Sequence, residues 1–347
     1  MTAVPDPRRI GALLRDASVT VDADLPAQVR VEVARIAGRP PGAGTSPRVH
    51  VGPALPADAG PRRLLWMHST NAGVDGLLRA SGPAGWPAGT LLTRTVGRMG
   101  ERIGQYVLGW VLADCQDVVG FLHQHEARVW QRRPARLAAG ERAVVFGTGG
   151  IGTAIGRALR AVGVRTVGVA RTPRPADGGD GRGGSGGSGG SDGCGGFDGV
   201  VTLDAVLREA ARPAGEAGET ARVLAGARWL VNALPLTPAT ERLLGAELFA
   251  AAGGAALINV GRGATVDTDA LAAALASGTL RGAVLDVLPE EPAPPESAVW
   301  DLPRTVITSH SSGPTTEADI VADFRTAWTC LTAGELPPLT VRPDAGY

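Results

Sequence analysis

Short apolar runs alternate with helix-like stretches through the second half of the chain. Residues 143–146 and 166–169 are apolar and short enough for buried strands, and the helical pattern of residues 151–162 separates them. The alternation continues, through helical stretches such as residues 267–277, with further apolar runs at residues 229–234, 255–260, 282–285 and 306–308. Strands that alternate with helices in this way form a parallel sheet covered on both faces. The pattern predicts an α/β domain.

The first third of the chain has a weaker pattern. Residues 1–60 are rich in proline, glycine and arginine, and we expect one helix and two short strands there. A strand is expected at residues 64–68, and apolar residues at helical spacing predict one long helix over residues 99–125. Residues 315–332 predict a helix that returns to the first domain. Residues 178–196 are almost only Gly, Ser and Asp, so we expect a flexible loop.

Composition excludes several classes of function. The formal net charge is zero, whereas a protein that binds phosphate backbones needs a basic surplus. No apolar run reaches the ~20 residues of a transmembrane helix, and the N-terminus lacks the apolar stretch of a secretory signal. The cysteines, Cys115, Cys194 and Cys330, are too far apart in sequence for a disulfide framework or a metal knuckle. We therefore expect a cytoplasmic protein that binds no nucleic acid, membrane or metal.

The basic residues add a further exclusion, because all 34 of them are arginine. Schiff-base chemistry on the enzyme and the usual Walker-type phosphate loop both use lysine, so neither is expected. Arginine also binds planar carboxylates in a bidentate manner, which lysine does less well.

A glycine-rich turn follows the first strand of the alternating region. Residues 147–152 read Gly-Thr-Gly-Gly-Ile-Gly, follow an apolar strand and open an apolar helix. In the dinucleotide fingerprint, Gly147 allows the tight turn, Gly149 lets the backbone approach the pyrophosphate, and Gly152 lets the helix pack on the strand. The helix N-terminus, at Gly150 and Ile151, then offers free amides to the anion. The alternative is a glycine-rich turn without a ligand.

The end of the second strand distinguishes the two nicotinamide cofactors. An NAD site places an acidic residue there for the ribose hydroxyls, but this chain has Ala170, followed by Arg171, Thr172 and then Arg174. Arginine pairs well with a phosphate. We therefore expect NADP(H) as the preferred cofactor, with NAD(H) as the alternative if the two arginines are merely solvated.

Six segments, taken together, resemble the D-isomer-specific 2-hydroxyacid dehydrogenase family. They keep the family's order and spacing over residues 64–320. Besides the glycine-rich turn they are residues 72–75 (Ala-Gly-Val-Asp), 234–237 (Leu-Pro-Leu-Thr), 258–263 (Ile-Asn-Val-Gly-Arg-Gly), 285–287 (Leu-Asp-Val) with Glu291-Pro292 behind, and 309–313 (Ser-His-Ser-Ser-Gly). Within the family, the chain looks most like the glyoxylate and hydroxypyruvate reductase branch, which Arg171 fits.

The resemblance implies an α/β fold of two domains. A Rossmann-type doubly wound parallel sheet would occupy residues 96–305. Both termini, residues 1–95 and 306–347, would form a smaller flavodoxin-like substrate domain. The resemblance also implies a homodimer, with the long helix and the segment near Trp130 packing across the interface.

The resemblance also carries over a set of site residues. The implied catalytic residues are Arg262, Glu291 and His310, and the implied substrate contacts are Ala72, Gly73 and Arg262. Asp286 matches the acidic residue near the nicotinamide carboxamide. Further cofactor contacts are implied at Leu234, Pro235, Val260, Gly261 and Gly313.

These residue types suit the reduction of a small 2-keto acid to its 2-hydroxy acid. Arg262 can bind the carboxylate and polarise the ketone, because its guanidinium is planar and permanently charged. His310 can donate a proton to the ketone oxygen, since histidine titrates near neutral pH. Glu291 can orient the imidazole and stabilise its protonated form. Glu290 competes for this role, but Glu291 directly precedes the proline, as the family pattern requires.

Three features depart from the family pattern. The first 60 residues are shorter and more irregular than the family's first lobe, Gln105 stands where an acidic residue is usual, and Ser309 replaces the proline before the histidine. Two other functions therefore stay open. One is a cofactor-binding interaction protein without catalysis, and the other is a dehydrogenase of the same fold for a larger biosynthetic substrate.

Overall fold

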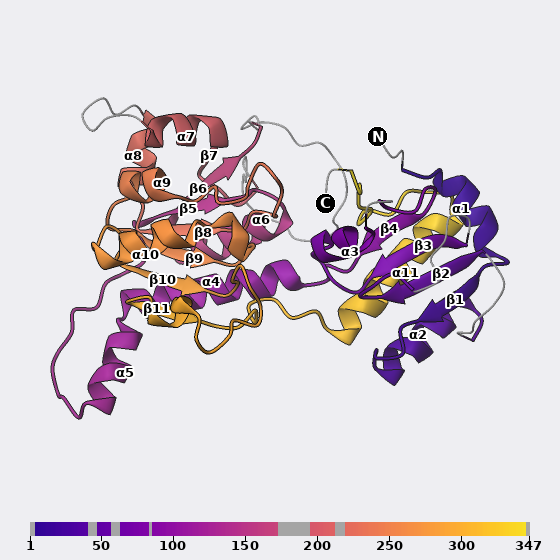
Figure 1. The fold of residues 1–347 in the computed structure, drawn as a ribbon, viewed down its shortest axis with the longest axis horizontal. Helices are drawn as coiled ribbons and strands as arrows, with labels where there is room; N and C mark the ends of the chain where they lie inside the picture. The colour runs from indigo at the N-terminus through magenta and orange to yellow at the C-terminus, as the bar shows by residue number, and fades with distance from the viewer. Residues whose placement is uncertain are drawn as a thin grey trace. The chain divides into compact units, whose positions relative to one another are not determined.

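The computed structural model divides into two compact units, and the chain passes from one unit to the other twice. It describes residues 4–40, 47–56, 63–82, 85–172, 195–211 and 219–344. The smaller unit comprises Met1–Met99 and Pro314–Tyr347, and the larger unit is Gly100–Gly313 (Figure 1). The domain boundary expected after residue 305 needs correction. It would cut strand β11 (Thr305–Ile307), which pairs with β10 (Gly282–Leu285) in the larger unit.

The larger unit is built on a seven-stranded parallel sheet with the order β11-β10-β9-β8-β5-β6-β7. The chain starts at the middle strand, adds β6 and β7 on one side, and then adds β8 to β11 on the other. This reversal defines the doubly wound Rossmann arrangement, so the expected α/β fold with a Rossmann-type sheet is confirmed. The strands are β5 (Arg142–Phe146), β6 (Arg165–Ala170), β7 (Gly199–Thr202), β8 (Trp229–Asn232), β9 (Ala256–Asn259), β10 (Gly282–Leu285) and β11.

Helices cover both faces of this sheet. Val144 and Phe146 of β5 belong to a core that includes residues of four helices: α7 (Leu203–Ala210), α8 (Glu219–Ala225), α9 (Ala246–Ala251) and α10 (Thr268–Ala276). Val145 points to the other face, because successive strand residues alternate. There a Cβ on Gly152 of α6 (Gly150–Arg160) would lie 3.7 Å from the Val145 side chain. Helix α4 (Met99–Cys115) packs on α6, since a Cβ on Gly104 would lie 3.0 Å from the carbonyl oxygen of Ala154.

The single helix expected over residues 99–125 is two helices, α4 (Met99–Cys115) and α5 (Val118–Glu126). The break lies at Asp117, whose φ of 52° is left-handed. Aspartate tolerates that conformation better than most residues, but a helix cannot continue through it. The Asp117 carboxylate also pairs with Arg133, so the chain beyond α5 folds back to the break.

The smaller unit has a parallel sheet of four strands, β1 (Ser18–Val21), β2 (Arg48–Gly52), β3 (Leu64–Ser69) and β4 (Leu91–Arg94), in that order. A flavodoxin-like sheet has the order 2-1-3-4-5 and reverses at its first pair. The described strands show no such reversal. Between β1 and β2 the described chain has only helix α2 (Ala27–Ala37), which explains why the first lobe is short.

Helices also cover both faces of the smaller sheet. One core joins strand residues to α1 (Pro7–Leu14), α2 and α11 (Glu317–Thr332), and in it the ring of Trp66 stacks on Phe324 at 5.1 Å. The other core includes Leu77 of α3 (Asp75–Ala80) and Val341. The described part of residues 1–60 thus contains two helices and two strands, one helix more than expected. Helix α1 has only eight residues, and Asp6 caps it while proline begins it.

Two expectations fall on parts of the chain that are not described. Arg174 and most of the expected Gly/Ser-rich loop, residues 178–194, lie outside the described residues. Across the described ranges, no helix is both long and apolar enough to cross a lipid bilayer.

Candidate active site

The glycine-rich turn joins β5 to α6 at the point where the strand order reverses. Gly147 has a φ of 100°, and a Cβ on Gly152 would lie only 1.8 Å from the carbonyl oxygen of Gly147. Only glycine therefore fits at both positions. A Cβ on Gly149 or Gly150 would meet nothing within 4 Å, so the backbone there faces open space. The amides of the first turn of α6 have no partner within the helix and suit an anion such as a pyrophosphate.

The residues expected to select the cofactor follow the neighbouring strand. Strand β6 ends at Ala170, beside Thr202 of β7, and Arg171 and Thr172 come next with exposed side chains. Because β5 and β6 are parallel neighbours, these side chains lie at the same sheet edge as the glycine-rich turn. The NADPH preference stays a prediction.

Three buried polar residues that sequence reasoning missed shape the loop after β9. Nδ2 of Asn232 donates to Oδ1 of Asn259 at 2.8 Å and to Oγ1 of Thr265 at 2.7 Å. The Thr265 hydroxyl donates to the carbonyl oxygen of Arg262 at 2.6 Å, and Oδ1 of Asn259 accepts from the amide of Gly261 at 3.2 Å. The signal in the sequence was an asparagine at the end of each of two fully buried strands, β8 and β9.

The glycines beside Arg262 bring three loops into contact. A Cβ on Gly261 would lie 2.7 Å from the carbonyl oxygen of Leu234, and one on Gly263 would lie 1.9 Å from the carbonyl carbon of Leu288. The Gly-Arg-Gly run is therefore more than an exposed turn, because a larger residue on either side would displace Arg262. The half-buried Arg262 side chain donates from Nη1 to the carbonyl oxygen of Gly261 at 2.8 Å.

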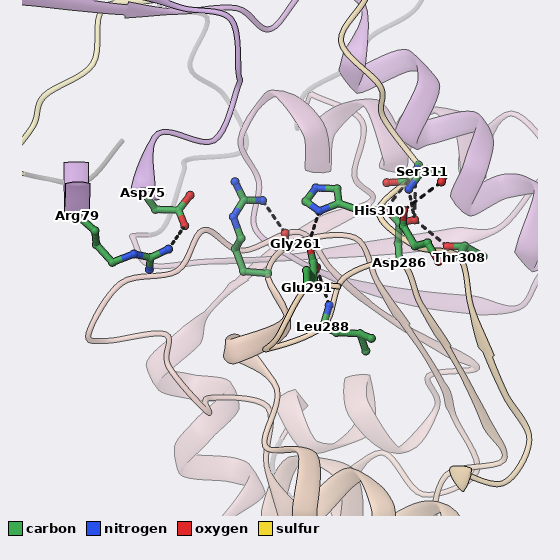
Figure 2. A network of polar contacts seen from close by, with 12 residues as sticks. Asp75, Arg79, Gly261, Asp286, Leu288, Glu291, Thr308, His310 and Ser311 are labelled. Atoms are coloured by element: carbon green, nitrogen blue, oxygen red, sulfur yellow. Dashed lines mark hydrogen bonds and ion pairs between the residues drawn. The ribbon is translucent and has the colours of Figure 1, made fainter. Parts of the chain in front are cut away.

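The structure places Glu291 and His310 in direct contact (Figure 2). Nδ1 of His310 lies 2.6 Å from Oε2 of Glu291, and Oε1 of Glu291 accepts from the amide of Leu288 at 2.8 Å. Glu291 rather than Glu290 thus contacts the histidine. Among the described residues, Nε2 of His310 has no hydrogen-bond partner, and the side chain is 56% exposed. That nitrogen is available to exchange a proton.

Asp286 is buried, and its carboxylate accepts several hydrogen bonds from the segment around His310. Its side chain is 2% exposed, and its carboxylate accepts hydrogen bonds from the amides of Ser311 and Ser312 and from the hydroxyl of Thr308. Its carbonyl oxygen accepts from the amide of His310 at 2.6 Å. The expected contact of Asp286 with the nicotinamide carboxamide stays a prediction.

The conformation of the histidine loop explains one departure from the family pattern. Ser309 has a φ of 53° and His310 a φ of 55°. Proline is locked near a φ of about −65° and could not adopt this conformation. A residue other than proline is therefore required before the histidine in the loop as it is folded here.

The expected site residues divide between the two units. Arg262, Glu291 and His310 belong to the larger unit, with Leu234, Pro235 and Val260 among the expected cofactor residues, and Gly313 is its last residue. Ala72 and Gly73 belong to the smaller unit, in the loop after β3, where Nη1 of Arg94 donates to the carbonyl oxygen of Ala72 at 3.2 Å. Their expected contact with substrate stays a prediction.

Comparison with known proteins agrees with this geometry. Residues 199–312 match the family model of the D-isomer specific 2-hydroxyacid dehydrogenase NAD-binding domain, and this segment contains Arg262, Glu291 and His310. A Streptomyces coelicolor protein, known as the uncharacterized protein in the mprR 3′ region, is 48% identical over 314 residues, which cover 90% of this chain and 100% of the relative. Glyoxylate/hydroxypyruvate reductase A of Serratia proteamaculans is 28% identical over 82% of each chain.

Solved structures agree over almost the whole chain. The D-isomer specific 2-hydroxyacid dehydrogenase of Xanthobacter autotrophicus Py2, in complex with NADPH and MES, is 26% identical with a TM-score of 0.76 and covers 95% of this chain and 99% of its own. A probable 2-hydroxyacid dehydrogenase of Rhizobium etli CFN 42, in complex with NADP, HEPES and L(+)-tartaric acid, is 25% identical with a TM-score of 0.72 over the same shares. The chain belongs to the D-isomer-specific 2-hydroxyacid dehydrogenase family of NAD(P)-dependent oxidoreductases.

Proposed function

We propose that this protein uses NADPH to reduce a small 2-keto acid, of the glyoxylate or hydroxypyruvate type, to the D-2-hydroxy acid. The observation that carries the proposal is the contact of 2.6 Å between His310 and Glu291, in the same unit as Arg262. A carboxylate-oriented histidine and an arginine are the groups that this reduction needs from the protein. The family supplies the D stereochemistry.

The glycine-rich turn fits a nicotinamide dinucleotide. Gly149 and Gly150 face open space that a side chain would fill, and the first turn of α6 offers its amides to the pyrophosphate. Arg171 lies where a 2′-phosphate is bound in this fold. The structural neighbour from Xanthobacter autotrophicus Py2 was crystallised with NADPH, which supports the same cofactor here.

The proposed reaction divides the work between three side chains. The bound cofactor supplies the hydride to the ketone carbon. Arg262 binds the substrate carboxylate and polarises the ketone. Nε2 of His310 donates the proton to the ketone oxygen as negative charge develops there, and Glu291 holds the imidazole through Nδ1. In the reverse direction His310 accepts the proton from the hydroxyl.

The choice of small substrate rests on the relative from Serratia proteamaculans, which is named for glyoxylate and hydroxypyruvate. The test is NADPH oxidation, followed by absorbance, with glyoxylate, hydroxypyruvate, pyruvate and a bulky aromatic 2-keto acid. We expect turnover of glyoxylate or hydroxypyruvate. Turnover of the bulky acid alone would favour the larger-substrate alternative. Tight NADPH binding without any turnover would favour the non-catalytic interaction protein.

We also propose that the protein is a homodimer joined through α5 and the segment after it. Large apolar side chains are exposed there: Phe121 at 45%, Leu122 at 56%, Trp130 at 100% and Leu137 at 80%. A soluble monomer rarely exposes such a concentration of apolar surface. Sedimentation should give a dimer, and Trp130→Ser should shift the population toward monomer. A wild-type monomer at micromolar concentration would exclude this proposal.

A further inference from the structure

A chain of hydroxyl groups connects helix α4 to the loop that carries His310. The hydroxyl of Tyr106, on α4, lies 2.6 Å from Oγ1 of Thr308, and that hydroxyl donates to Oδ1 of Asp286 at 2.7 Å. Because Thr308 has one hydroxyl hydrogen and gives it to Asp286, Tyr106 must be the donor to Thr308. The two hydrogen bonds therefore run in one direction: Tyr106 donates to Thr308, and Thr308 donates to Asp286.

Asp286 in turn accepts hydrogen bonds from the amides of three consecutive residues, His310, Ser311 and Ser312. Its carboxylate accepts from the amide of Ser311 at 2.8 Å (Figure 2) and from the amide of Ser312 at 3.1 Å. Its carbonyl oxygen accepts from the amide of His310. A buried carboxylate that loses one of its donors is left with unsatisfied hydrogen-bonding capacity. The position of the whole loop therefore depends on the complete set of donors around Asp286.

The loop needs these hydrogen bonds because its backbone adopts an uncommon conformation. Ser309 and His310 are consecutive non-glycine residues with left-handed φ values of 53° and 55°. Residues with a Cβ keep this conformation only where the surrounding structure holds them in it. The bonds to Asp286 act at the second of these residues and at the two that follow it, through the amides of His310, Ser311 and Ser312.

The tyrosine keeps its proton over the range in which a dehydrogenase works. Burial is the main cause, and the nearby charge of Asp286 contributes; together they raise the pKa of Tyr106 to about 12. Tyr106 therefore remains a hydrogen-bond donor to Thr308 at neutral and moderately alkaline pH.

We propose that Tyr106 and Thr308 are positioning residues, which hold the His310 loop through Asp286 so that the imidazole keeps its contact with Glu291. The catalytic consequence rests on the proposed role of His310 as proton donor. The effect on the order of the loop does not depend on that role, because the hydrogen bonds to Asp286 hold the loop whether or not His310 donates a proton. Neither hydroxyl is needed to contact substrate or cofactor.

The test compares Thr308→Val and Tyr106→Phe, which each delete one hydroxyl, with Thr308→Ser, which keeps it. Thr305→Val, on β11 just before Thr308, is the matched control, because among the described residues the Thr305 hydroxyl bonds only the nearby Pro303 carbonyl. Amide hydrogen exchange of a peptide covering residues 308–316 reports the loop without requiring activity. We expect about fivefold faster exchange in Thr308→Val, which corresponds to one lost hydrogen bond, a smaller rise in Tyr106→Phe, and near wild-type exchange in the other two.

Steady-state kinetics then distinguish a displaced His310 imidazole from a general loss of protein structure. In Thr308→Val we expect kcat to fall ~10–100-fold with little change in the KM for NADPH, because a small displacement of a reacting group is enough for such a loss. In a His310→Ala background, Thr308→Val should cause no further loss, since both changes act through the same imidazole.

Three results would overturn the proposal: unchanged exchange in Thr308→Val, a fall in kcat without faster exchange, or losses that multiply in the double variant. An inactive wild type would instead contradict the proposed function. The exchange data would still decide whether the hydroxyl chain holds the loop.

Discussion

The Nδ1 atom of His310 lies 2.6 Å from Oε2 of Glu291, and the backbone amide of Leu288 holds the other oxygen of that carboxylate. The carboxylate is thus fixed at both oxygens, and the imidazole has one orientation in which Nε2 is left for the substrate. A carboxylate in this position can hold the correct tautomer and stabilise the imidazolium, as in other histidine-carboxylate pairs.

Glu291→Gln should lower kcat/KM for keto-acid reduction by ~10²-fold, because the amide cannot supply the negative charge beside the imidazole. Glu290→Gln is the matched control, since its side chain is exposed one position away, and it should stay within about twofold of wild type. Steady-state kinetics at saturating NADPH measure both. Equal losses in the two variants would show that the 2.6 Å contact has no catalytic meaning.

Arg262→Lys should retain the charge but lose most of the activity. The planar guanidinium can contact a carboxylate with two parallel hydrogen bonds, and an ammonium cannot. We expect kcat/KM to fall by ~10–10³-fold, with a large part of the loss in the KM for the keto acid. Arg242→Lys, in an exposed ion pair with Asp267, should change little. Wild-type kinetics in Arg262→Lys would remove Arg262 from the site.

The features of the fold and of the site that depend on residues close together in the chain could be predicted from the sequence. The glycine-rich turn was readable because its strand, turn and helix are consecutive in the chain, and the structure explains why Gly147 and Gly152 carry no side chain. The alternation of strands and helices was readable for the same reason. Glu291 and His310 were paired only by the resemblance, because they are 19 positions apart and no local rule connects them.

The remaining features depend on contacts between residues far apart in the chain. Tyr106 and Thr308 are 202 positions apart, and their contact follows from the packing of α4 on the sheet. The bond between Asn232 and Thr265 requires the register of β8 and β9. The break at Asp117 depends on one left-handed residue inside an otherwise helical pattern. Hydrophobic periodicity reports the buried face of an element and contains none of this information.

Arg171→Ala should weaken the preference for NADPH. If the guanidinium binds the 2′-phosphate, the KM for NADPH should rise ~10–100-fold while the KM for NADH changes only a few-fold, because NADH lacks that phosphate. Arg208→Ala, an exposed arginine of α7, controls for the loss of one positive charge on the same unit. A parallel rise for both cofactors would contradict the role given to Arg171.

The buried His68 should make the smaller unit sensitive to acid. Thr95 gives its one hydroxyl hydrogen to the Ser69 carbonyl and so accepts from Nε2 of His68. A neutral imidazole that donates from Nε2 accepts at Nδ1, so Thr93, which accepts from Trp66 Nε1, donates to Nδ1. Burial lowers the pKa of His68 to about 3. The unfolded chain takes up a proton below a pH of ~6.5 and the folded chain does not, so stability falls as the pH drops through that range.

The expected loss is about 2 kcal/mol in the free energy of unfolding between pH 7 and pH 5. His68→Gln keeps one donor and one acceptor but does not titrate, so its stability should lack this component. Urea unfolding of both proteins at the two pH values, followed by tryptophan fluorescence, measures the difference. The same decrease in the variant as in wild type would assign the acid sensitivity to other groups.

The most direct test of the central claim is the rate of NADPH oxidation with glyoxylate and hydroxypyruvate in wild type and in His310→Ala. His123→Ala, an exposed histidine of α5, serves as the control, and NADPH affinity is measured by fluorescence in all three proteins. We expect His310→Ala to lose ~10²–10⁴-fold in kcat and to bind NADPH as tightly as wild type. A kcat within a few-fold of wild type in His310→Ala would contradict the assignment of His310 as proton donor.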